Sequence, residues 1–327
     1  MLYALSENQK IVDAKQATRG KKYLCPGCKN RVTLRQGQAK VPHFAHQKFQ
    51  CNVFSEGESK EHLHGKNILM KMAQQQYETV ELEAYLSDLK QKPDLLINNK
   101  IALEFQCSPI TVEKMVARSK GYEKKNLRYF WFLGQRHRLK RKMTQQIAQF
   151  LHWHPNLGFY LIYVDVERKK LSINYNIQMA DFLDVKFRSY ETSSFSGLKF
   201  LFNQKKLSNY YSLNIRQQSL QMQRLNIGNF KSTGVFRDMQ RLTYENGLIF
   251  ERMIPFLIQK HFAYPIFQQY HFVWLIKKIT KQNANEALFQ LPFVNLEKIL
   301  LMFESENKIE YYNSNSRIKV GFDDTRN

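Results

Sequence analysis

The fold is decided by the stretch Pro93-Asp94-Leu95-Leu96-Ile97-Asn98-Asn99-Lys100-Ile101-Ala102-Leu103-Glu104-Phe105-Gln106. Two short apolar runs flank the dipeptide Asn98-Asn99, and asparagine tolerates the backbone angles of a tight turn, so the stretch predicts a β-hairpin. Because side chains alternate along a strand, Leu103 and Phe105 should share one face and Glu104 the other. The sequence therefore predicts a carboxylate within an otherwise apolar sheet.

A second carboxylate, that of Asp94, opens the first strand of this hairpin. Pairing of the two strands would bring Asp94 near Glu104, and buried carboxylates are costly unless they are paired or bound to a cation. Mg²⁺ takes a few acidic oxygens and keeps water and phosphate oxygens as its other ligands. The sequence predicts a Mg²⁺ or Mn²⁺ site with Asp94 and Glu104 as ligands, where the ion would activate water for phosphodiester hydrolysis.

A helix is predicted ahead of the hairpin, from a capping box at Ser55 to Glu58 as far as about Gln76. Glu58, His62 and Lys66 are spaced i, i+4 and i+8, so they share one face of this helix. We expect that face to close the site from the side. A solvent-exposed face with ordinary i,i+4 contacts is the alternative.

Each polar group around the two acids has an expected role. Lys66 or Gln106 would position the attacking water, and of these only Lys66 carries a charge. Glu58 and His62 would support the metal ligands, while Glu61 borders the same helix face and is an alternative to Glu58.

A helix over residues 111–125 and an aromatic strand over residues 127–133 are predicted to follow the hairpin. Arg118 and Tyr122 share one face of that helix and are candidates to hold a backbone phosphate, with Tyr122 also bonding an active-site carboxylate. A dense basic run comes next, which indicates a solvated loop and a phosphate contact. Its candidate DNA-binding residues are Arg136, Arg138, Lys140 and Arg141.

A metal knuckle precedes all of this, beginning with Cys25-Pro26-Gly27-Cys28. The turn folds the two thiolates toward one ion, and zinc in structural sites prefers four ligands in a tetrahedron. His43, His46 and Cys51 compete for the two remaining places; we favour His46 and Cys51, with His43 as the alternative. A closed site of this kind has a structural role.

The 327 residues have a net charge of +22, and 43% of them are hydrophobic, which is typical of a globular protein that attracts polyanions. Nucleic acid is the first candidate partner, an anionic membrane surface the second, and a merely soluble basic protein the alternative. The start of the chain lacks a signal-peptide pattern, and no apolar run is long enough for a membrane span. A cytoplasmic location is expected, where four cysteines bind metal more readily than they form disulfides.

The order of predicted elements indicates a mixed α/β (α+β) fold in three domains. Residues 1–54 would form a small β unit, residues 55–180 an α/β core and residues 185–327 a mainly helical region. The helical region has long helical patterns at 246–262, 268–282 and 294–304.

The sequence resembles the competence protein CoiA family. The residues that carry the resemblance are Cys25 to Cys28, Pro42 to His46, Glu58, His62, Lys66, Pro93, Asp94, Ala102 to Ser108, Arg118, Tyr122 and Trp131 to Leu133.

The resemblance implies a zinc-ribbon-like N-terminal unit, a restriction-endonuclease-like domain with a mixed sheet and a helical C-terminal region. It also implies action on incoming DNA in natural transformation and recombination. Asp94 and Glu104 match the acidic pair of the PD-(D/E)xK nuclease pattern, whereas Gln106 stands where that pattern usually has lysine.

Three functions follow as hypotheses. The first is a Mg²⁺-dependent DNA nuclease, and the second is a non-catalytic recombination factor that binds single-stranded DNA through basic and aromatic residues, or binds recombination proteins. The third is a protein held at a membrane surface by charge.

Overall fold

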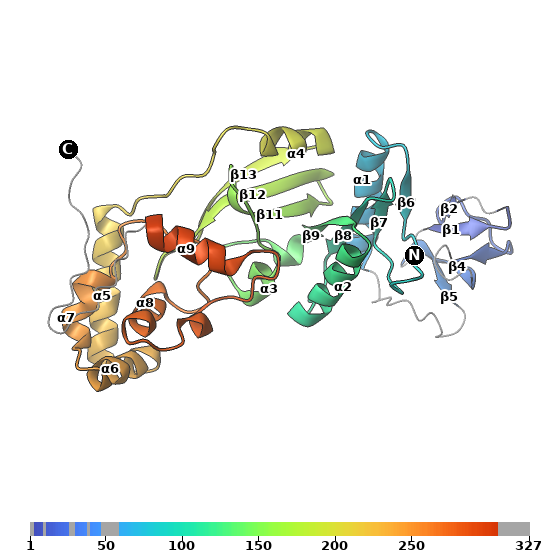
Figure 1. Cartoon of the computed structure of the whole chain (residues 1–327). Helices are drawn as coiled ribbons and strands as arrows, with labels where there is room; N and C mark the ends of the chain where they lie inside the picture. The colour runs from blue at the N-terminus through green and yellow to red at the C-terminus, as the bar shows by residue number, and fades with distance from the viewer. Residues whose placement is uncertain (1–2, 9–10, 26–29, 38–39, 47–58, 307–327) are drawn as a thin grey trace. The chain divides into compact units, whose positions relative to one another are not determined.

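The computed structural model describes residues 3–8, 11–25, 30–37, 40–46 and 59–306 (Figure 1). The fold is mixed α/β, as predicted. The chain divides into two compact units, the first formed by residues 1–138, 162–173 and 190–201, the second by residues 139–161, 174–189 and 202–327. The predicted division into three domains remains a prediction.

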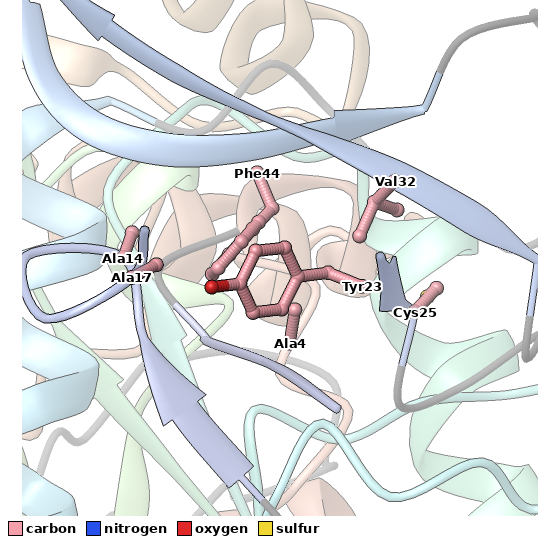
Figure 2. Packing of buried hydrophobic residues seen from close by; sticks show 7 residues of the cluster. All are labelled: Ala4, Ala14, Ala17, Tyr23, Cys25, Val32 and Phe44. Carbon is pink, nitrogen blue, oxygen red and sulfur yellow. The ribbon is translucent and has the colours of Figure 1, made fainter. Parts of the chain in front are cut away.

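A small antiparallel sheet forms the N-terminal part of the first unit. Its strands follow the order β2-β1-β3-β4-β5. They are β1 (Tyr3–Ser6), β2 (Ile11–Asp13), β3 (Tyr23–Leu24), β4 (Arg31–Gly37) and β5 (Lys40–His46). Figure 2 shows its core, in which Tyr23 and Phe44 pack with ring centroids 4.8 Å apart. Alanines and Val32 fill the space around these two rings, and Cys25 belongs to the same buried cluster.

A second, mixed sheet carries the predicted hairpin. Its strands follow the order β13-β12-β11-β9-β8-β7-β6, and β10 pairs with β11. They are β6 (Val80–Leu82), β7 (Leu95–Ile97), β8 (Ile101–Gln106), β9 (Arg128–Leu133), β10 (His152–His154), β11 (Gly158–Asp165), β12 (Lys170–Gln178) and β13 (Lys186–Thr192). β7 pairs antiparallel with β6 and with β8, whereas β8 and β9 are parallel.

The β7–β8 hairpin is confirmed, and its turn has the chemistry that the sequence indicated. Asn98 and Asn99 both adopt positive φ, of 47° and 51°, and the Lys100 backbone N–H donates to the Ile97 carbonyl at 2.9 Å, so the two asparagines are the central residues of a tight turn. The register pairs Leu95 with Leu103. This turn therefore fixes which residues of the two strands face each other.

Two helices cover opposite faces of this hairpin (Figure 1). Helix α1 (Lys60–Gln74) packs on the side of Phe105, because a Cβ placed on Gly65 would come within 1.9 Å of the Phe105 ring. Helix α2 (Val112–Lys124) packs on the other side, where Tyr122 belongs to a buried cluster with Ala102.

The starts of both helices are set by a side-chain cap. Thr111 caps α2 as predicted. Helix α1 starts later than predicted, because its cap is Ser59, whose hydroxyl accepts from the His62 backbone N–H at 3.1 Å. Residues 55–58 lie outside the described residues.

The remaining helices are α3 (Gln145–Ala148), α4 (Phe195–Phe202), α5 (Ile215–Lys231), α6 (Val235–Glu245), α7 (Phe250–Leu257), α8 (His271–Ile279) and α9 (Leu296–Glu306). The patterns at 246–262, 268–282 and 294–304 correspond to α7, α8 and α9. In the described part of the chain, none of the helices has the length and apolar character needed to cross a bilayer.

Candidate active site

Asp94 and Glu104 lie on neighbouring strands at the end of the hairpin. Asp94 directly precedes β7 and Glu104 lies within β8, and the register of these two strands begins with the pair Leu95 and Leu103. Here the Asp94 carboxylate accepts a hydrogen bond from the Phe105 backbone N–H at 2.7 Å. Both acids are buried, Asp94 with 8% and Glu104 with 1% of its surface exposed.

The Asp94 carboxylate is held from α1. Its Oδ2 lies 3.2 Å from His62 Nε2 and its Oδ1 3.8 Å from Lys66 Nζ. Burial alone would raise the pKa of Asp94, but His62, and then Lys66, lower it to about 2. Asp94 is therefore ionised at neutral pH. His62 is fixed from its other side too, because its ring stacks on Phe105 with centroids 5.8 Å apart.

Lys66 contacts a third acid, Glu83, that the sequence analysis missed. The Glu83 oxygens lie 2.6 Å from Lys66 Nζ and 2.7 Å from Lys92 Nζ. Burial opposes the ionisation of Glu83, but these two ammonium groups hold its pKa well below its usual range. Glu83 follows β6 with φ of 52°, so the alternation of the strand does not predict where its side chain goes. The sequence does hold one hint, because Lys92 directly precedes Pro93 and Asp94 and so puts a second cation next to the predicted site.

The Glu104 carboxylate is held from α2. Tyr122 donates its hydroxyl to Oε1, which is the hydrogen bond to a carboxylate expected from the sequence. Arg118 Nη2 lies 2.8 Å from both oxygens. Burial raises the pKa of Glu104 to about 7, against the opposing effect of Arg118. The neighbouring charge of Asp94 raises it further, so the two acids lie within electrostatic reach of each other.

The site thus contains three buried carboxylates, each of which contacts at least one cationic side chain. Glu83, Asp94 and Glu104 come from three successive segments of one sheet, and their partners come from both flanking helices and from Lys92. Across residues 59–306 and the described parts of the small sheet, no group of three or more His, Cys, Asp and Glu side chains is placed to hold a metal ion.

Two other predicted members of the site form hydrogen bonds with groups other than its acids. Gln106 donates its side-chain amide to the Ser108 carbonyl at 2.6 Å. Glu61 accepts a hydrogen bond from the Gln135 backbone N–H at 2.6 Å, which ties α1 to the segment after β9. Glu58 lies outside the described residues. Of the two candidates for positioning water, Lys66 is the one that contacts Asp94.

The basic run after β9 is largely exposed, and Arg138 is the candidate residue in it that packs against the protein. Arg138 donates to the Ser172 hydroxyl at 2.7 Å and its guanidinium lies 4.7 Å from the centre of the Tyr163 ring. Arg141 forms an ion pair with Asp184 at 2.9 Å. Arg136 and Lys140 are exposed.

Part of the predicted zinc knuckle falls within the described residues. Cys25 is buried, and its backbone N–H donates a hydrogen bond to the Asn30 carbonyl at 2.8 Å. Alternation along β5 puts His46 on the same face as the buried Phe44 and His43 on the other. His46 therefore lies on the side of the sheet that holds Cys25. Cys28 and Cys51 lie outside the described residues.

The Glu83 cluster generates a stability prediction. Glu83→Gln keeps the shape of the side chain but removes the charge that Lys66 and Lys92 contact. Loss of one partner from a buried ion pair should lower the free energy of unfolding by about 3–5 kcal/mol. Urea unfolding at pH 7 measures it. The matched control is Glu81→Gln, an exposed position on β6, and an equal loss in both variants would contradict the buried network.

Glu104 generates a prediction about pH. The folded chain keeps a proton on Glu104 up to its pKa of about 7, while the unfolded chain releases it near 4.5. Between these values the folded state binds more protons, so its stability should fall as pH rises. Glu104→Gln removes this effect. The difference in unfolding free energy between wild type and Glu104→Gln should change by up to about 3 kcal/mol from pH 4.5 to 7. A difference that stays constant over that range would contradict the raised pKa.

Comparison with known proteins places the chain in a family. The model of the competence protein CoiA N-terminal domain matches residues 6–54, and that of the competence protein CoiA nuclease-like domain matches residues 58–206. Competence protein CoiA of Bacillus subtilis (strain 168) is 31% identical over 158 residues, which cover 46% of this chain and 40% of that relative. No solved structure matches. The two family models together cover more than half of the sequence, and the chain therefore belongs to the competence protein CoiA family and carries its nuclease-like domain.

Proposed function

We propose that this chain is a divalent-cation-dependent nuclease that cuts DNA during natural transformation, acting in the cytoplasm on incoming strands. The observation that carries the proposal is that the Asp94 carboxylate reaches the strand of Glu104, where it accepts a hydrogen bond from the neighbouring Phe105 backbone N–H at 2.7 Å, with Lys66 Nζ 3.8 Å away. The nuclease-like domain and the competence family point to DNA as the substrate. The net charge of +22 supports a polyanionic substrate as well.

The chemistry of the two acids fits Mg²⁺ or Mn²⁺, since both ions prefer carboxylate oxygens. Asp94 and Glu104 would hold the ion, which when bound polarises a phosphate and makes water a better nucleophile. Asp94 is already ionised, with a pKa of about 2, and needs no proton released before it can serve as a ligand.

The remaining chemistry falls to side chains of α1. Lys66 is held between Glu83 and Asp94, so its ammonium group is positioned to orient water or to stabilise charge on a phosphate. His62 keeps the Asp94 carboxylate in place. Gln106 is engaged with Ser108, so we assign the role of the usual lysine to Lys66.

A second candidate function is DNA binding without cleavage. It is favoured by the contacts of Glu104, whose carboxylate is covered by Tyr122 and Arg118. In that case the domain would serve recombination by holding DNA or a partner protein.

A cleavage assay with single-stranded and supercoiled DNA in Mg²⁺ or Mn²⁺ tests the proposal. Asp94→Ala and Lys66→Met should each lower the rate at least about a hundredfold, because each removes a group that acts on the transition state. Asp88→Ala and Lys71→Met, at exposed positions, are the matched controls and should cut like wild type.

If wild type and every variant cut DNA at the same background rate, the proposal of a nuclease is wrong. Binding of a labelled oligonucleotide that weakens steeply with salt, together with no cutting, would establish the second function instead.

We also propose that the N-terminal unit binds one structural zinc ion through Cys25, Cys28 and two of His43, His46 and Cys51. Soft thiolates and imidazoles are the donors that zinc takes in closed sites. The small sheet has a core of only a few residues, so a bound ion would add stability that the sheet needs.

Metal analysis of the purified protein should return about one zinc per chain. Cys28→Ala should lose the zinc and make the N-terminal unit sensitive to proteolysis. Cys107→Ala is the control, because Cys107 is a buried cysteine that follows β8 and should not contribute to zinc content. Full zinc content in Cys28→Ala would refute the knuckle.

A further inference from the structure

The contacts of Glu104 are unusual for a metal ligand. Arg118 Nη2 lies 2.8 Å from each of its oxygens, and the Tyr122 hydroxyl donates to one of them. A carboxylate has lone pairs left beyond these bonds, but a guanidinium at that distance repels any incoming cation. In this arrangement Arg118 therefore competes with a divalent ion for Glu104.

Arg118 is also the member of this group that faces solvent. Its side chain is 34% exposed, whereas that of Glu104 is 2% exposed. The guanidinium has further contacts around it, with the Lys92 carbonyl at 3.3 Å and with the Trp131 ring, whose centre is 5.8 Å away. A ligand that arrives from solvent thus meets Arg118 before it meets Glu104.

Arginine is suited to phosphate because its planar fork donates two parallel hydrogen bonds. A phosphate that takes these bonds draws the guanidinium away from the carboxylate. Glu104 would then lose its cationic partner while buried, which makes a metal ion a far better partner than before.

From these contacts we propose that Arg118 is a phosphate-operated latch on Glu104, so that binding of a nucleic-acid phosphate and binding of the metal ion strengthen each other. The inference rests on the proposed role of Asp94 and Glu104 as metal ligands. By linkage, the factor by which phosphate tightens metal binding equals the factor by which metal tightens nucleic-acid binding. Without nucleic acid the Arg118 contact keeps metal affinity low.

Mn²⁺ binding to the full chain, followed by electron paramagnetic resonance of the unbound ion and without DNA, tests the latch. Arg118→Gln removes the competing cation and should tighten Mn²⁺ binding about tenfold, the usual size of such a coupling. Tyr122→Phe removes the other donor to Glu104 without changing charge and should tighten it in the same direction. Lys120→Gln, an exposed position on α2, is the control for loss of a positive charge and should match wild type.

The reciprocal measurement uses an oligonucleotide labelled with a fluorophore. Ca²⁺ should tighten its binding to wild type about tenfold relative to a chelator, and the effect should vanish in Arg118→Gln. Thermal melting of each variant shows whether it is folded. If Arg118→Gln does not fold, Tyr122→Phe replaces it in the Mn²⁺-binding test.

Two failures can be told apart. If Asp94→Ala abolishes Mn²⁺ binding but Arg118→Gln and Tyr122→Phe bind Mn²⁺ no more tightly than wild type, the latch is wrong and the metal site stands. If Mn²⁺ binding is the same in wild type and Asp94→Ala, the metal site is wrong and the latch falls with it.

Discussion

The structure of the nuclease-like domain depends on the neutralisation of buried carboxylates at one end of a hairpin. The hairpin brings the Asp94 carboxylate to the backbone N–H of Phe105, the residue after Glu104, and both acids are buried away from water. An isolated charge in such a place costs several kcal/mol. The cations that offset this cost come from α1, α2 and Lys92, so the same ion pairs that make the acids tolerable also dock both helices onto the sheet.

This dependence explains why parts of the site could be predicted from the sequence. The turn at Asn98-Asn99 and the alternation around Glu104 are local signals, and they are sufficient to predict the hairpin of β7 and β8. The cap at Thr111 and the i,i+4 spacing of Arg118 with Tyr122 are equally local. Each of these features is determined by a few residues that are neighbours in the sequence.

Glu83 shows where sequence reasoning stops. Its strand alternates in the ordinary way, but its positive φ turns the side chain onto Lys66 and Lys92, residues that are distant in the sequence or lie beyond a loop. The second unit also contains a contact that could not be predicted from neighbouring residues. Asp181 accepts hydrogen bonds from the first backbone N–H groups of α8, at His271 and Phe272, which lie about ninety residues later. Tertiary partners of this kind leave no periodic pattern to read.

The arrangement has a chemical consequence beyond stability. Glu83 contacts Lys66 at 2.6 Å, closer than the 3.8 Å between Lys66 and Asp94, so the lysine is held mainly by an acid that is not one of the proposed ligands. Lys66 cannot move away from the site without leaving Glu83 buried beside Lys92 alone. On the other side of the hairpin, the Glu104 carboxylate forms an ion pair with Arg118 and accepts a hydrogen bond from Tyr122. The two acids thus differ in their surroundings: Asp94 is ionised beside His62 and Lys66, whereas the carboxylate of Glu104 is bound by Arg118 and Tyr122.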